Sequence, residues 1–240
     1  RFSLDYSKTD YGMGLLKSGR NKPLIVVLAD QNTQLKADAP HLKDKLQIIK
    51  GAENKAFVQY ATEQPKREQV LSAWSYLQKY YQTDSLFMEQ STPIEDIQKE
   101  ITRLHKEEQD FLDQLPKGSY AKWFLPRRKL IGSVSQIAQH RTDEIPETRE
   151  ALQCMDYTDN RWYKSGLLKD ALEKHIWFIE NSSGALDQVF KDLNTSIDII
   201  ANQLKNDEDK FNLVLGKMFE ILEERSLFTS SEYLAEKLLN

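Results

Sequence analysis

The chain has 240 residues, of which 40% are hydrophobic and 29% charged, a mixture typical of a folded globular protein rather than a disordered or fibrous one. Its net charge of −4 excludes a strongly basic nucleic-acid-binding protein as the default class. The longest apolar run, at residues 24–29, is far shorter than the roughly 20 residues of a membrane-spanning helix, so we predict no transmembrane segment.

Residues 1–50 predict a small antiparallel β region, because short runs rich in β-branched and aromatic residues alternate there with turn formers. The expected strands are Phe2–Tyr6, Tyr11–Leu16, Leu24–Ala29, Thr33–Asp38 and Leu46–Ile49. The chain opens inside a strand pattern and without Met, so we expect this region to be truncated at its N-terminus. Its net charge of +4 also contrasts with −8 for residues 51–240.

From Gly51 onward, apolar residues recur at three- and four-residue steps, which predicts helices. One expected apolar stripe comprises Val70, Leu71, Trp74, Leu77 and Tyr81, and a second comprises Ile94, Ile97, Ile101, Leu104, Phe111, Leu112 and Leu115. Thr92 with Glu95 predicts a capping box at the start of the second helix, and Pro93 suits its first position.

Residues 119–140 predict a further helix that Pro126 breaks or kinks. The strongest pattern follows near the C-terminus, in two stripes made of Leu186, Val189, Phe190, Leu193, Ile197, Ile200 and Leu204, then of Phe211, Val214, Leu215, Met218, Phe219 and Leu222. Short polar breaks at 181–184 and 206–207 predict antiparallel neighbours. Thr229 with Glu232 predicts a last capping box. The fold class is therefore α+β and predominantly α, with a β region at 1–50 and a region of antiparallel helices at 51–240.

The cysteine and histidine content gives no sign of redox or metal chemistry. A single cysteine, Cys154, excludes a disulfide within the chain and a zinc site built on several thiolates. Because its neighbours are apolar, we interpret Cys154 as a buried structural thiol. The four histidines lack the spacing that puts two ligands on one helical face, so we predict no metal site and no cofactor; they are His41, His105, His140 and His175.

The other motifs that could carry chemistry have simpler structural interpretations. The acidic clusters at 107–110 and 207–209 are interpreted as a solvated helix face and a helix N-terminus. Gly12 and Gly14 are interpreted as close backbone packing or a bulge inside a strand. The aromatic residues at 162–163 and 177–178 are interpreted as packing, and the basic run at 127–129 as a solvated helix turn.

The order of segments resembles the region that precedes the catalytic domain in secreted or lipid-anchored TlpA/ResA-like thiol-disulfide oxidoreductases. The matching segments are Tyr11–Leu16 and Leu24–Ala29 in the β region, and Gly51–Phe57 where that region leads into the helices. The stronger match lies in Met155–Asp159, Leu167–Leu168, Asn206–Phe211 and Tyr233–Lys237. These are packing and capping patterns, and the Cys-x-x-Cys dithiol on which the family's activity depends is absent. No catalytic, cofactor-binding or metal-binding residue is therefore assigned to this chain.

The resemblance implies a non-catalytic accessory region of an extracytoplasmic oxidoreductase, which positions a thioredoxin domain beginning after Asn240 or recognises the substrate protein. Two alternatives remain open. The chain could be a self-standing helical module that binds a partner through an exposed apolar groove between helices. It could also be an enzyme whose site converges from distant residues such as His140, Asp156 and Arg161.

Overall fold

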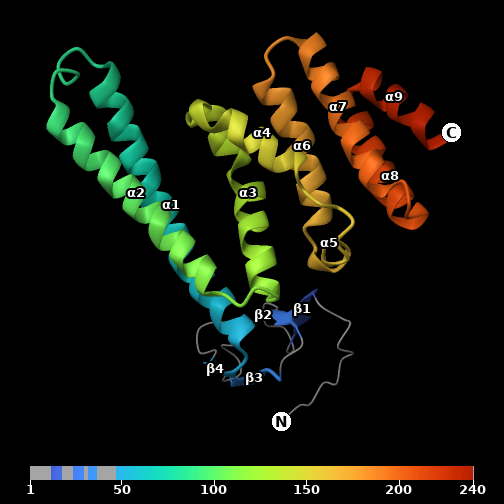
Figure 1. Ribbon diagram of the computed structural model, residues 1–240, viewed down its shortest axis with the longest axis horizontal. Helices are drawn as coiled ribbons and strands as arrows, with labels where there is room; N and C mark the ends of the chain where they lie inside the picture. Colours follow the sequence, from blue (N-terminus) through green and yellow to red (C-terminus); the bar gives the residue numbers. More distant parts are fainter. Residues whose placement is uncertain (1–11, 18–23, 30–31, 37–46, 240) are drawn as a thin grey trace. The chain divides into compact units, whose positions relative to one another are not determined.

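The computed structural model describes residues 12–17, 24–29, 32–36 and 47–239 (Figure 1). The chain divides into two compact units, residues 1–125 and residues 126–240. The described residues of the first unit form four short strands and the hairpin of α1 and α2, and the second unit contains the helices from α4 to α9. The boundary between the units falls inside helix α3, whereas the change from strands to helices falls at residues 50–52.

The described strands form two antiparallel pairs, as the sequence predicts. Strand β1 (Gly12–Leu16) pairs with β2 (Leu24–Leu28), and β3 (Gln34–Lys36) pairs with β4 (Gln47–Lys50). The expected strand at residues 2–6 lies outside the described residues. A Cβ atom on Gly14 would lie 3.0 Å from Cδ1 of Leu28, so this glycine packs closely against a side chain of β2 rather than against its backbone.

Helices α1 (Ala52–Thr83) and α2 (Ser91–Gln114) form a long hairpin (Figure 1). Two hydrogen bonds join the helices, one of 2.6 Å from the Tyr60 hydroxyl to Glu108 Oε1 and one of 2.7 Å from Gln78 Nε2 to Gln98 Oε1. Four buried apolar side chains belong to the hairpin, namely Leu71, Ile97, Leu104 and Leu112. The second expected stripe is thus confirmed as the face of α2 that packs against α1.

Two predicted capping boxes are wrong by one or two residues. Helix α2 begins at Ser91 after Gln90, which makes no side-chain cap bond, so Thr92 lies inside the first turn. Pro93 still costs no hydrogen bond there, because first-turn N–H groups have no intrahelical acceptor. Helix α9 begins at Phe228, so Thr229 is also inside its helix. Such shifts arise because several residues in a row can begin a helix.

Helix α3 (Tyr120–His140) is continuous through Pro126, so the expected break is not found. At the N-terminus of α3, a first-turn amide has a side-chain acceptor, because Ser119 Oγ accepts a 3.1 Å hydrogen bond from the Lys122 amide. A proline in a helix leaves one carbonyl without its intrahelical donor. The helical hydrogen bonds on both sides of Pro126 outweigh that cost here. The same holds in α1, which contains Pro65.

Two adjacent polar side chains at the start of α1 join the elements of the first unit. The Glu53 carboxylate is buried and accepts hydrogen bonds from the first-turn amides of α3, at 2.9 Å from Tyr120 N and 2.8 Å from Ala121 N. The Asn54 side chain, also buried, accepts from Val27 N at 2.8 Å and donates to Val27 O at 2.9 Å. Sheet, hairpin and third helix therefore meet at one point.

The second unit is a helical bundle built on the predicted C-terminal stripes. It contains η1 (Thr142–Glu144), α4 (Ile145–Gln153), α5 (Arg161–Ser165), α6 (Leu168–Ser182), α7 (Leu186–Leu204), α8 (Glu208–Glu224) and α9 (Phe228–Leu239). Leu193, Ile197 and Ile200 of α7 are almost fully buried, as are Val214 and Leu215 of α8. Figure 1 shows α6, α7 and α8 side by side with short connections, as expected for antiparallel neighbours.

We predict that Asn54→Ala destabilises the first unit by about 2–4 kcal/mol, because it leaves both backbone groups of Val27 buried without partners. Hydrogen exchange of the β2 amides measures the loss of protection directly. The exposed Asn212 of α8 provides the control, and Asn212→Ala should change protection by less than about 0.5 kcal/mol. Equal protection of Val27 in the wild type and Asn54→Ala would contradict the role of Asn54.

Candidate interaction surface

Cys154 is exposed, so its interpretation as a buried structural thiol is wrong. The residue follows the last residue of α4, and its amide donates a 2.9 Å hydrogen bond to Glu150 O. Its neighbours Leu152 and Met155 are buried, and they occupy the inward side of this helix end. Because Cys154 lies between them, its side chain is left on the outward side. Apolar neighbours in the sequence did not indicate the direction of this side chain.

The described histidines lie on three different helices. His105 on α2 and His140 at the end of α3 are exposed, and His41 lies outside the described residues. His175 on α6 is buried, and its Nε2 lies 3.2 Å from Ser196 Oγ of α7. Burial lowers the pKa of His175 to about 4, so the ring is neutral near pH 7 and acts as a packing residue.

One acidic residue that was expected to be solvated is buried. Glu108 is 4% exposed and accepts the 2.6 Å hydrogen bond from Tyr60, whose pKa is raised by burial and by this carboxylate. Glu107, by contrast, is exposed and pairs with Arg103. The second cluster is as predicted, because Asp207 is the N-cap of α8 and accepts from the Lys210 amide at 3.1 Å.

Trp162 and Phe178 are packing residues, as interpreted from the sequence, whereas Tyr163 and Trp177 are half-buried. Trp162 and Phe178 are fully buried, and Trp162 Nε1 donates a 2.7 Å hydrogen bond to Asp156 O. The Tyr163 hydroxyl donates to Tyr157 O at 2.8 Å. The basic run is less solvated than expected, since the Arg127 guanidinium lies 5.9 Å from the Trp162 ring centre and burial lowers its pKa. These contacts hold the loop between α4 and α5.

The three residues proposed for a convergent enzyme site are each engaged in local structure or in solvent. Arg161 makes an ion pair of 2.6 Å with Asp159, and Asp156 Oδ1 accepts from the Thr158 amide at 2.9 Å. His140 is exposed at the end of α3. Within the described ranges, no group of three or more His, Cys, Asp or Glu is placed to hold a metal ion. Among those same residues, no helix has the length and apolar character needed to span a bilayer.

The main unexplained surface lies on the distal half of α1. The side of α1 that faces α2 is marked by Tyr60 and Gln78, which bond to α2, and by the buried Leu71. These residues are 11 and 7 positions apart, so they share one helical face. Val70 and Leu77, assigned from the sequence to the same stripe as Leu71, are instead 43% and 40% exposed. That prediction of one buried stripe is therefore wrong.

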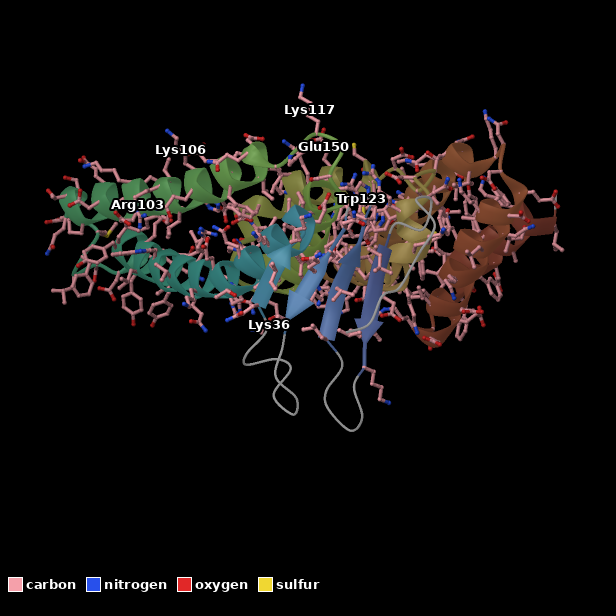
Figure 2. All side chains as sticks on the ribbon, turned by 90° about the horizontal axis from the view of Figure 1, so that it is seen from below. Lys36, Arg103, Lys106, Lys117, Trp123 and Glu150 are labelled. Atoms are coloured by element: carbon pink, nitrogen blue, oxygen red, sulfur yellow. The ribbon has the colours of Figure 1, made fainter. Side chains whose placement is uncertain are left out.

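We name the second apolar face of α1 the outer seam, and it comprises Val70, Ala73, Leu77 and Tyr80. At about 100° per residue, its centre is turned by roughly 130° from the face that contacts α2. Tyr80 is 45% exposed, and the neighbouring Tyr76, 63% exposed, lies against it with ring centres 5.3 Å apart. Figure 2 shows ring-bearing side chains projecting from the distal half of α1 on the side away from α2.

A groove of different character lies between α1 and α2. It has a volume of about 700 Å³ and is lined by Gln78 and Gln82 of α1 and by Ile94, Thr102, Arg103 and Lys106 of α2. Arg103 and Lys106 are labelled in Figure 2. Arg103 is paired with Glu100 at 2.8 Å, so its charge is balanced within its own helix. Apart from Ile94, the residues that line the groove are polar or charged, whereas the outer seam consists of apolar and aromatic residues.

The outer seam could have been found in the sequence. Its residues follow steps of three, four and three, the spacing of a coiled-coil stripe, directly beside the inner residues Leu71, Trp74 and Tyr81. A helix with two apolar faces normally packs on two sides. The two faces lie side by side in the sequence, so they look like a single apolar stripe. The distal half of α1 therefore presents a surface suited to a protein partner.

Comparison with known proteins adds no relative: no family model matches the chain, and no curated protein or solved structure matches it either.

We predict that the second unit loses stability as the pH falls from about 6.5 to about 4, because His175 is neutral when folded and binds a proton when unfolded. The loss should be on the order of 3 kcal/mol at the acidic end. Urea unfolding of wild type and His175→Gln at several pH values measures it. His175→Gln should show a smaller pH dependence, whereas His105→Gln, at an exposed site, should behave like the wild type.

We also predict that Leu77→Glu leaves the melting temperature of the dilute chain within about 2 °C of the wild type, because the side chain is exposed. Leu71→Glu adds the same charge at a buried position of the same helix and should lower it strongly. Thermal unfolding followed by circular dichroism at ~1 µM compares them. Similar losses in both variants would mean that Leu77 is part of the chain's own core.

Proposed function

We propose that the chain is a non-catalytic accessory region of an extracytoplasmic thioredoxin-like thiol-disulfide oxidoreductase, and that it binds protein rather than performs chemistry. The single observation that carries the protein-binding role is the outer seam of α1, an apolar helical face exposed to solvent. Large exposed apolar surfaces that follow helical spacing are typical of sites for another protein. The thioredoxin context is supported by the order of segments and by the sequence patterns that resemble that family.

The residues that carry the resemblance have structural roles consistent with an accessory region. Tyr157 is fully buried, and its carbonyl accepts from the Tyr163 hydroxyl. Leu167 and Leu168 are buried at the start of α6. Near the C-terminus, the Tyr233 hydroxyl donates to Asp198 Oδ1 at 2.9 Å and so ties α9 to α7. In this proposal, such a bundle supplies a rigid support to which a thioredoxin domain is joined.

The coding sequence downstream of Asn240 tests the thioredoxin context. We expect an open frame that continues into a domain with a Cys-x-x-Cys motif at the start of a helix, where one thiolate attacks a substrate disulfide. A stop codon directly after Asn240, or a downstream domain without this dithiol, would sink the assignment. The protein-binding role of the outer seam would remain.

The second candidate is a self-standing helical interaction module. It is favoured by the same seam, because the seam lies on a hairpin that is complete within residues 52–114. The two candidates differ in what accompanies the chain and agree on the surface that binds. The reading frame downstream of Asn240 therefore distinguishes the two candidates. Measurements on the outer seam test the protein-binding role that both candidates share.

A further inference from the structure

We infer that the outer seam is a homodimer interface, in which two copies of the chain pair through antiparallel α1 helices. This inference rests on the proposed role of the seam as a protein-binding surface and names the partner as a second copy. The spacing of the seam extends by one position at each end, to Lys66 and Asp84. The full series of 66, 70, 73, 77, 80 and 84 then has steps of four, three, four, three and four.

This series is symmetric about position 75, which makes it self-complementary in an antiparallel pair. A two-fold axis there places Val70 of one copy beside Tyr80 of the other, and Ala73 beside Leu77. Each layer thus combines a smaller with a larger side chain, the arrangement that fills space between two helices without a void or a clash. An isologous contact needs one surface to complement itself, and this seam does.

The charges at the two ends of the seam complement each other in the same register. Lys66 of one copy lies beside Asp84 of the other, and the reverse pair closes the opposite end. Lys66 is exposed and Asp84 is half-buried. A parallel pair would instead place Lys66 beside Lys66 and Asp84 beside Asp84, which is repulsive. Between the charged ends, a span of about 27 Å at 1.5 Å per residue, the seam itself carries no charge.

The exposed area fits a dimer of modest affinity. Val70, Tyr76, Leu77 and Tyr80 are 40–63% exposed, and Leu86 and Met88, in the turn that follows α1, are 73% and 54% exposed. At ~200 Å² for a large side chain, Val70, Leu77 and Tyr80 of the seam expose on the order of 250 Å². With Tyr76, Leu86 and Met88, which lie outside the seam, the exposed area of the distal half of the hairpin is on the order of 600 Å². That value is at the upper end of what monomers expose and somewhat below the ~800 Å² per partner of a standard interface.

Sedimentation velocity on the 240-residue chain tests the dimer. We expect monomer at ~1 µM and a predominant dimer at ~200 µM. Leu77→Glu places a charge in the central layer and should abolish the dimer over this range. Gln82→Glu adds the same charge on an exposed position of α1 outside the seam, and should associate like the wild type.

Charge exchange tests the antiparallel register. Lys66→Asp and Asp84→Lys each place like charges beside one another at both ends of the pair, so each should raise the dissociation constant about tenfold or more. The double variant Lys66→Asp with Asp84→Lys restores opposite charges and should return to within about threefold of the wild type. Asp84 Oδ1 also accepts the Leu86 amide at 2.9 Å, so circular dichroism must first show unchanged helicity in the Asp84 variants.

A chain that stays monomeric at ~200 µM would overturn the inference, as would a dimer that is indifferent to Leu77→Glu. A dimer in which the double charge variant is no better than the single ones would overturn the register. None of these outcomes bears on whether a Cys-x-x-Cys domain follows Asn240, so the accessory role and the homodimer can fail independently.

Discussion

The buried carboxylate of Glu53 is the constraint on which the first unit depends. It joins the start of α1 to the start of α3 across 67 residues of chain, through the amides of Tyr120 and Ala121. Those amides have no intrahelical acceptor, and a negative charge at a helix N-terminus also interacts favourably with the helix dipole. The chain between the two helix starts must therefore leave and return to one place. An antiparallel pair of helices satisfies that requirement.

The consequence is a hairpin whose two ends differ. Near Glu53 the start of α1 packs against β2 and against aromatic residues of α3, with the Phe57 and Phe124 rings 5.8 Å apart. Farther along, α1 has α2 as its neighbour on one side, and beyond Leu71 it buries no further residue. A two-helix hairpin can cover only one face of each helix, so a second apolar face on α1 remains in solvent. The outer seam is therefore exposed because the hairpin has no third helix to cover it.

Local patterns predicted much of this architecture, and long-range contacts limited the rest. Alternation and helical spacing identified the described strands and the C-terminal helices, because both depend on residues close in sequence. Glu53 and Asn54 gave no signal, since their partners are 67 and 27 residues away. Glu108 looked solvated for the same reason, because its Tyr60 partner lies 48 residues earlier. The spacing of apolar residues in α1 indicates the outer seam, but the burial of each residue is needed to distinguish it from the adjacent stripe that packs on α2.

The position of Asn54 also affects what the small sheet can do. Val27 presents one N–H and one C=O on the side of β2 that faces away from β1, and a side-chain amide takes both. An amide carries the same donor and acceptor as a peptide group, so Asn54 substitutes for one residue of a further strand. Exposed strand edges recruit other chains into aggregates. The Asn54 side chain thus blocks strand addition at Val27 of β2, and helix α1 takes the place of a further strand there.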